Sequence, residues 1–215
     1  MAEVEDWLQD PLKSRKLKSH DSKQGSLWHS FHFSTRLKLD GAEHFCRQVL
    51  GAASMPYDLG LPLLAHRQLK WYLDAFFFEL MSAYDTLLQE LNIIYAYDLG
   101  LKPKQVRWDS KEGRLLKDKL PEQLLKYMKK EREKEWLRKA RQYRNLAAHQ
   151  AYVPTGEIKT GWGDKPWDYA KHEVSLYYDD TGQWKNERIT ACLTYLKKMV
   201  EHVQHVWREM VQEFQ

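Results

Sequence analysis

The sequence predicts an all-α protein, an up-and-down helical bundle with a small β-hairpin or loop insertion before the last helix. Long segments in which apolar residues recur at alternating steps of four and three indicate the helices. Residues 155–186 lack these steps and are rich in turn residues, which indicates the insertion. At 215 residues the chain fits one domain and can bury a core without disulfides or metal.

The N-terminal residues show no clear hydrophobic period. The stretch "PLKSRKLKSHDSKQGS" is polar and basic and includes Gly and Ser, so residues 1–34 are predicted to form a flexible or loosely docked arm. Residues 35–215 are then predicted to form one helical domain. Its first helix is expected from Thr35 to Leu50, and the prolines and glycines in "GAASMPYDLGLP" predict a loop after it.

The second and last helices have the clearest patterns. Steps of four and three in the second helix predict a buried stripe of Leu69, Leu73, Phe76, Leu80, Tyr84, Leu87, Leu91 and Ile94. Gly100 and Pro103 mark its end. The same steps in the last helix predict a stripe of Ile189, Leu193, Leu196, Val200, Val203, Trp207, Met210 and Phe214.

The segment between these two helices is more varied. A short polar turn with Trp108 is followed by a predicted third helix, which has Pro121 in its first turn and stops before Pro154. The stretch "GEIKTGWGDKPWDY" is expected to be loop. In "HEVSLYYDDTGQWKNE", two β-like runs flank an Asp-Asp-Thr-Gly turn, which predicts a small hairpin.

Composition narrows the class of protein. The 34 basic and 30 acidic residues give a net charge of +4, which mildly favours a polyanionic partner. The two cysteines lie far apart without metal-ligand spacing, and the acidic start "MAEVEDWLQD" is no signal peptide, so we expect a reduced cytoplasmic protein. The apolar run "DAFFFELM" is too short to span a bilayer. No phosphate-binding glycine loop or nucleophile motif appears, and we expect no cofactor and no metal.

The stretch "RQYRNLAAHQ" near the end of the third predicted helix carries the candidate catalytic residues Arg144, Asn145 and His149. At about 100° per residue, Arg144 falls on the apolar face that Ala140 and Tyr143 share. A guanidinium stays charged at any working pH and resists dry burial. Arg144 is therefore expected to have a carboxylate partner or to face a wet cleft.

Asn145 and His149 share a different face of this helix. The same side carries a basic stripe that we predict to bind RNA, formed by Lys134, Arg138 and Arg141. Arg144 and His149 diverge in an ideal helix, so their joint action requires the helix to end, kink or meet a symmetry mate near Ala148.

Plainer interpretations of these residues stay open. The motif can also be a helix-terminal polar cluster that satisfies local carbonyls. The charge run "KKEREKEWLRKAR" is more typical of a solvated face with ion pairs four residues apart than of an RNA track. His202 and His205 in "HVQH" have a spacing that a metal can use, but an exposed polar face is the favoured interpretation.

The segment "RNLAAH" resembles the Arg-x4-6-His signature of HEPN domains (higher eukaryotes and prokaryotes nucleotide-binding), in which Asn, Asp or His commonly follows the Arg. The expected architecture is similar as well, because the family is a bundle of mostly four or five helices with this motif late in a helix. The preceding helix commonly carries aromatic and acidic residues, as "FFFELMSAYDTLLQELN" does. The resemblance covers about residues 60–213, and the arm and the 155–186 insertion lie outside it.

The resemblance implies a function. Many HEPN domains are metal-independent endoribonucleases, typically dimeric, in toxin–antitoxin, CRISPR and stress systems, and others are inactive binding modules. Carried over to this chain, Arg144, Asn145 and His149 would form the active site of a homodimeric ribonuclease, a toxin or a stress or defence factor with an antitoxin protein as partner. The alternative is a non-catalytic helical module that binds a nucleotide or a protein.

Overall fold

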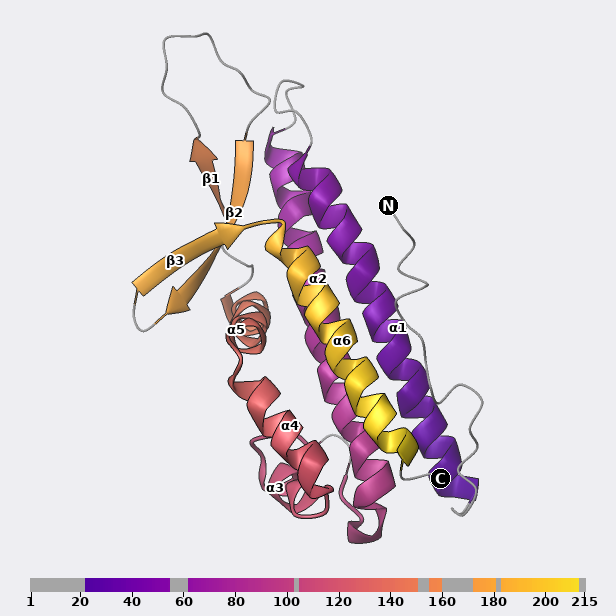
Figure 1. Ribbon diagram of the computed structural model, residues 1–215. Helices are drawn as coiled ribbons and strands as arrows, with labels where there is room; N and C mark the ends of the chain where they lie inside the picture. The colour runs from indigo at the N-terminus through magenta and orange to yellow at the C-terminus, as the bar shows by residue number, and fades with distance from the viewer. Residues whose placement is uncertain are drawn as a thin grey trace, which may run out of the picture. The chain divides into compact units, whose positions relative to one another are not determined.

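The computed structural model describes residues 22–54, 62–102, 105–150, 155–159, 172–180 and 183–212. It confirms an all-α fold with a small β insertion before the last helix (Figure 1). The elements are α1 Ser22–Ala53, α2 Pro62–Tyr95, the 3-10 helix η3 Tyr97–Leu99, α3 Lys111–Lys117, α4 Glu122–Glu133, α5 Glu135–Gln150, β1 Thr155–Lys159, β2 His172–Asp180, β3 Gln183–Arg188 and α6 Ala191–Gln212. No helix formed by the described residues is long and apolar enough to cross a membrane.

Helix α1 begins at Ser22, so the start expected at Thr35 was wrong and residues 22–34 are helical. The face that this segment buries is largely polar: Gln24, Trp28, His32 and Thr35. The Gln24 side chain is satisfied by donating a hydrogen bond of 2.6 Å to the carbonyl of Ile93. A hydrophobic period therefore cannot reveal this part of the helix. Residues 1–21 of the expected arm lie outside the described residues.

The contacts of the chain divide it into two compact units. The first consists of Met1–Asp40, Ser82–Lys134 and Lys197–Gln215. The second consists of Gly41–Met81 and Glu135–Leu196. Helices α1, α2 and α6 contribute residues to both units, α3 and α4 belong to the first, and α5 and the sheet belong to the second.

A buried carboxylate joins three helices in the first unit. Glu90 on α2 accepts hydrogen bonds from Thr35 on α1 at 2.5 Å and from the Trp207 indole on α6 at 3.1 Å. Its second oxygen also lies 2.8 Å from Nδ1 of His32. Burial raises the pKa of Glu90, while these bonds act in the opposite direction. The carboxylate is fully enclosed and well bonded, which is typical of a structural core network.

Helix α3 was not expected, because only a polar turn was predicted around Trp108. The hydroxyl of Ser110 caps α3 by accepting a hydrogen bond of 3.0 Å from the Gly113 amide. A Cβ atom at Gly113 would lie 1.9 Å from the carbonyl oxygen of Arg107, so only glycine fits this close approach. The Gln89 side chain donates to the Val106 carbonyl at 2.9 Å and ties the preceding loop to α2.

The predicted stripes of α2 and α6 are largely buried. In α2, the buried members are Leu69, Leu73, Phe76, Leu80, Tyr84, Leu87 and Leu91. Ile94 is only half-buried, whereas the preceding residue Ile93 is buried. At the start of α6, Leu193 is 46% exposed, contrary to expectation, because Cys192 takes the buried position. Ile189 precedes α6, and Phe214 lies outside the described residues.

The segment after Pro121 differs from prediction in two places. The single third helix is two helices, α4 and α5, separated by Lys134 in an extended conformation with φ −63° and ψ 139°. The predicted hairpin is confirmed as β2 and β3, which pair antiparallel up to Asp180 and Gln183. Strand β1, expected to be loop, pairs antiparallel with the other edge of β2 and makes a three-stranded sheet.

Candidate functional site

Helix α5 carries the candidate motif. The break at the extended residue Lys134 determines which side chains of α5 are buried. The buried residues of α4 are Leu124, Met128 and Glu131. Continuing that spacing through an unbroken helix would turn polar residues of the next segment inward. The break instead lets α5 bury its apolar face, which consists of Trp136, Leu137, Ala140 and Tyr143. The helix then runs without interruption to Gln150.

Helical phase predicted Arg144 in the middle of this apolar face, and the structure buries the residue only in part. Its side chain is half-buried, and its Nε atom is enclosed without a hydrogen-bond partner among the described residues. The carboxylate partner that we expected is not found for Arg144 within that part of the chain. A guanidinium remains charged when it is enclosed, and an unused donor in such a place is costly unless an anion satisfies it.

The other predicted site residues are placed differently. Asn145 is exposed on α5. His149 belongs to the last turn of α5, and its side chain lies outside the described residues. Arg138 and Arg141 are half-buried on α5, where Arg141 Nε donates to the Leu137 carbonyl at 3.3 Å. Lys134 lies at the break and pairs with Glu131, so it does not continue a helical stripe with the two arginines.

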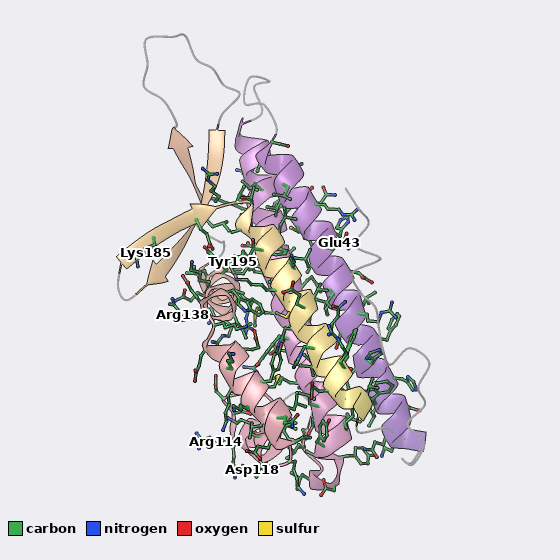
Figure 2. All side chains as sticks on the ribbon, in the orientation of Figure 1. Glu43, Arg114, Asp118, Arg138, Lys185 and Tyr195 are labelled. Atoms are coloured by element: carbon green, nitrogen blue, oxygen red, sulfur yellow. The ribbon has the colours of Figure 1, made fainter. Side chains whose placement is uncertain are left out.

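A carboxylate on the sheet anchors the turn of α5 next to Arg144. Glu187 on β3 accepts hydrogen bonds from the Tyr143 hydroxyl at 2.7 Å and from the Tyr195 hydroxyl of α6 at 2.5 Å (Figure 2 labels Tyr195). Its second oxygen lies 3.4 Å from Nζ of Lys139, which also pairs with Glu135 at 2.9 Å. Three side chains of the second unit, those of Tyr143, Tyr195 and Lys139, therefore converge on Glu187.

Aromatic contacts also hold the turn of α5 that carries Tyr143. The ring of Tyr143 stacks on Phe77 of α2, with centroids 4.5 Å apart, and meets Tyr195 edge-on at 6.1 Å. Burial and the neighbouring Glu187 carboxylate raise the pKa of Tyr143, so its phenol stays protonated and acts as a donor. The residue that precedes Arg144 is thus fixed by both a hydrogen bond and ring contacts.

None of these partners was predicted from the sequence. Tyr143 was placed on the apolar face, but no spacing linked it to Glu187, which lies 44 residues further along the chain. A buried tyrosine usually finds an acceptor for its hydroxyl, and that rule alone could have prompted the search. The acceptor itself depends on how the sheet folds back on α5, which packs against β2.

The buried side chains of His202, Cys46 and Cys192 are further titratable groups. His202 is fully buried between the rings of Tyr84 and Tyr127, and its burial, with the charges of His205 and Lys134, lowers its pKa to about 3. No group of three or more metal-binding side chains occurs among the described residues. Burial also raises the pKa of the Cys46 thiol to about 12 and that of Cys192, so neither thiol suits nucleophilic chemistry.

Comparison with known proteins decides the family. The family model of Cthe2314-like HEPN domains (HEPN_Cthe2314) matches residues 39–212. The chain belongs to this HEPN family. No curated protein and no solved structure matches it.

The HEPN match begins within α1 and ends at the last residue of α6, so it includes the sheet as well as the helices. It starts earlier than residue 60, where the resemblance in the sequence was expected to start. HEPN modules are typically ribonucleases or nucleotide-related proteins, and they often bind RNA and dimerise. The family match thus confirms the expected class of protein.

Proposed function

We propose that this HEPN protein is a metal-independent endoribonuclease with Arg144, Asn145 and His149 as its active site. The observation that carries the proposal is the half-buried side chain of Arg144, whose enclosed Nε has no partner among the described residues. The turn that bears it is fixed through Tyr143 and Glu187. A guanidinium that is fixed in place and has an unused N–H donor suits an anionic ligand such as a phosphodiester.

The proposed chemistry uses only the substrate, these side chains and water. RNA supplies its own nucleophile, because the 2′-oxygen can attack the adjacent phosphorus while the bond from phosphorus to the 5′-oxygen breaks. His149 would take the 2′-hydroxyl proton while water protonates the leaving 5′-oxygen, or His149 would protonate the 5′-oxygen while water takes the 2′-hydroxyl proton. Arg144 would stabilise the charge on the phosphorane oxygens, and Asn145 would orient His149 or donate to phosphate. The products are a 2′,3′-cyclic phosphate and a 5′-hydroxyl.

The continuity of α5 supports a homodimer as the active form. The helix neither ends nor kinks between Arg144 and His149. Five helical residues separate their directions by about 140°. A two-fold pairing of two copies would bring Arg144 of one near His149 of the other. Sedimentation should show a dimer at micromolar protein concentration, and a monomer at all such concentrations would contradict this part of the proposal.

Arg138 and Arg141, together with Lys134, are proposed to contact RNA beside the motif. Replacing both arginines by Gln should weaken RNA binding more at low salt than at high salt.

The proposed setting is the cytoplasm, where the protein would act as a toxin or a stress or defence factor restrained by an antitoxin protein. Induced expression of the wild type should then slow growth, whereas His149→Ala should not.

An RNA-cleavage assay in the presence of EDTA tests the central proposal. Cleavage should persist, should leave 2′,3′-cyclic phosphate ends and should spare DNA, which lacks the 2′-hydroxyl. His149→Ala should lower the rate by about 10²–10⁴-fold. Arg144→Lys should also be severely impaired, because an ammonium cannot reproduce the planar fork of a guanidinium.

Both variants should melt like the wild type, which separates a lost function from a lost fold. A requirement for divalent metal, or variants that cut RNA as fast as the wild type, would refute the active-site assignment. If the wild type binds RNA or nucleotides without cleaving RNA, the non-catalytic binding module is the correct function.

A further inference from the structure

The positive charge of the protein is concentrated in the segment that contains α3 and α4. Residues 102–134 hold twelve Lys and Arg against six Asp and Glu, a net charge of +6. The rest of the chain holds twenty-two basic and twenty-four acidic residues, a net charge of −2. The excess of +4 for the whole protein therefore arises entirely from this segment, which lies in the first unit.

The basic side chains occupy the exposed faces of both helices. Lys126, Lys129 and Lys130 have the spacing of one face of α4, opposite the buried Leu124 and Met128. Lys111 and Arg114 have the same relationship on α3, and Figure 2 shows Arg114 with Asp118 at the outer side of that helix. Only four residues join the two helices. We call these five residues the α3–α4 basic surface: Lys111, Arg114, Lys126, Lys129 and Lys130.

These five positive charges are not neutralised by acidic side chains within the described part of the chain. None of the five takes part in an ion pair among the described residues, and all five are exposed. Two of the six acidic residues in the segment are already engaged, because Asp109 pairs with Arg132 and Glu131 pairs with Lys134. The exposed carboxylates that remain nearby belong to Asp118, Glu122 and Glu133.

The backbone beneath the surface is firmly held, so the helices that carry the charges are preformed. Gly113 packs against the carbonyl of Arg107, and Gln89 fixes the loop before α3 through Val106. On α4, Met128 is fully buried. A preformed surface loses little conformational freedom when a ligand binds.

The segment offers charge but no free aromatic face to a nucleobase. Trp108 is buried and covered by Lys117, whose Nζ lies 5.1 Å from the ring centroid. Tyr127 contacts the ring of His205, with centroids 3.8 Å apart and planes tilted by 36°, and it stacks on His202. Base recognition on single strands relies on stacking, whereas phosphate contacts rely on Lys and Arg alone. The α3–α4 basic surface therefore suits the sugar–phosphate backbone of a nucleic acid.

We propose that the α3–α4 basic surface docks the phosphate backbone of RNA without sequence preference. The proposal rests on the ribonuclease function proposed above and adds a second contact region, distinct in sequence from Arg138 and Arg141. Its role is to raise the affinity for RNA through counterion release, and it takes no part in the cleavage step.

Binding is measured separately from cleavage. The probe is a fluorescent single-stranded oligoribonucleotide of mixed sequence with 2′-O-methyl sugars, which cannot be cut through its 2′-oxygen. Fluorescence anisotropy gives the dissociation constant over a series of salt concentrations. The variants are Lys129→Gln/Lys130→Gln on α4 and Lys111→Gln/Arg114→Gln on α3. The matched control is Lys197→Gln/Lys198→Gln, which removes two exposed charges from adjacent lysines of α6.

Each test variant should weaken RNA binding about ten-fold. The slope of log K against log salt should become shallower by about 1.4, because two phosphate contacts are lost and each contributes about 0.7 on a single strand. The control should bind almost like the wild type. All variants change surface side chains, and unchanged melting curves verify the fold. Test variants that bind like the wild type, or a control that loses as much affinity, would overturn the proposal.

The outcome is independent of the active-site proposal. His149→Ala should keep the full salt dependence even when cleavage is lost. If the wild type does not cleave RNA but the surface variants lose RNA binding, the ribonuclease proposal fails and the docking surface stands. If cleavage is confirmed and the surface variants bind normally, only the docking surface fails. Binding of phosphatidylserine vesicles through these residues, with no binding of the RNA probe, would assign the surface to a membrane and overturn the proposal.

Discussion

The hydroxyl of Tyr143 donates a 2.7 Å hydrogen bond to Oε1 of Glu187, which joins helix α5 to strand β3. Tyr143 is the neighbour of Arg144 in the chain, so this bond restrains the rotation of the turn that carries the proposed phosphate-binding group. The β insertion before α6 therefore has a structural role in the candidate site, because it supplies the carboxylate that fixes the turn.

Removing this bond should be measurable as a loss of stability. Tyr143→Phe deletes a donor to an ionised carboxylate inside a buried cluster, and such bonds contribute about 1.5–3 kcal/mol. The free energy of unfolding in urea should fall by about that amount. Tyr72→Phe is the matched control, because the half-buried Tyr72 has no hydrogen bond among the described residues and should change stability little. Equal losses in both variants would show that the Glu187 bond is not the cause.

Two leucines of α6 should respond very differently to truncation. Leu196 is buried, whereas Leu193 is 46% exposed three residues earlier. Leu196→Ala should lower the free energy of unfolding by about 2–5 kcal/mol, because it removes buried methyl groups and leaves a cavity. Leu193→Ala should cost less than about 0.5 kcal/mol. Thermal and urea unfolding of the pair would check the assignment, and similar losses would contradict the position of the α6 core face.

Two glycines should give substitutions of opposite sign. At Gly113, an added Cβ would collide with the carbonyl oxygen of Arg107, and the backbone of α3 or its preceding loop must shift. Gly113→Ala should destabilise by about 1–3 kcal/mol, as overpacking does. Gly25 in α1 has open space around its Cβ position, so Gly25→Ala should stabilise by about 0.5–1 kcal/mol through helix propensity. Unfolding curves of both variants test the close approach directly.

Buried His202 should make the protein sensitive to acid. Its pKa falls from 6.5 to about 3 on folding, so between these values the unfolded chain binds a proton that the folded chain does not. Stability contributed by neutral His202 should thus decrease as pH falls from 6.5 towards 3, by at most about 1.4 kcal/mol per pH unit.

His202→Phe provides the comparison, because it keeps an aromatic ring between Tyr84 and Tyr127 but cannot titrate. Urea unfolding at several pH values should show a shallower decline for the variant than for the wild type. Buried Glu90 has a raised pKa, so its contribution to stability changes with pH in the opposite direction. Glu90 is present in both proteins, and its effect therefore cancels when the two stability curves are subtracted. Parallel curves would mean that His202 is not buried as a neutral group.

The parts of the fold that the sequence predicted are those with an apolar period. The stripes of α2 and α6 carry enough Leu, Phe and Val to define one face, and the hairpin has a turn between β-like runs. The first part of α1 was missed because its buried face includes Gln24, His32 and Thr35, which are satisfied by distant partners such as Glu90. Strand β1 was missed because pairing with β2, and not its own composition, makes it a strand.

The candidate site was predictable only in its local features. Helical phase placed Arg144 in the middle of the apolar face, and the structure leaves its side chain half-buried. The supporting carboxylate Glu187 comes from another element and depends on tertiary contacts. The helix break at Lys134 was not predicted, because no glycine or proline stands there and the buried faces of α4 and α5 differ only in the folded chain.

The extended residue Lys134 also affects which changes in chain length the protein can accept. Inside a helix, one inserted residue rotates all following side chains by about 100°. A residue inserted in α5 before Tyr143 would therefore turn Tyr143 away from Glu187. At Lys134, where the backbone is already out of the helix, an insertion can be absorbed without changing which face of α5 is buried. Homologues with a longer or shorter charged run are expected to differ in length at this junction, with α5 kept at constant length.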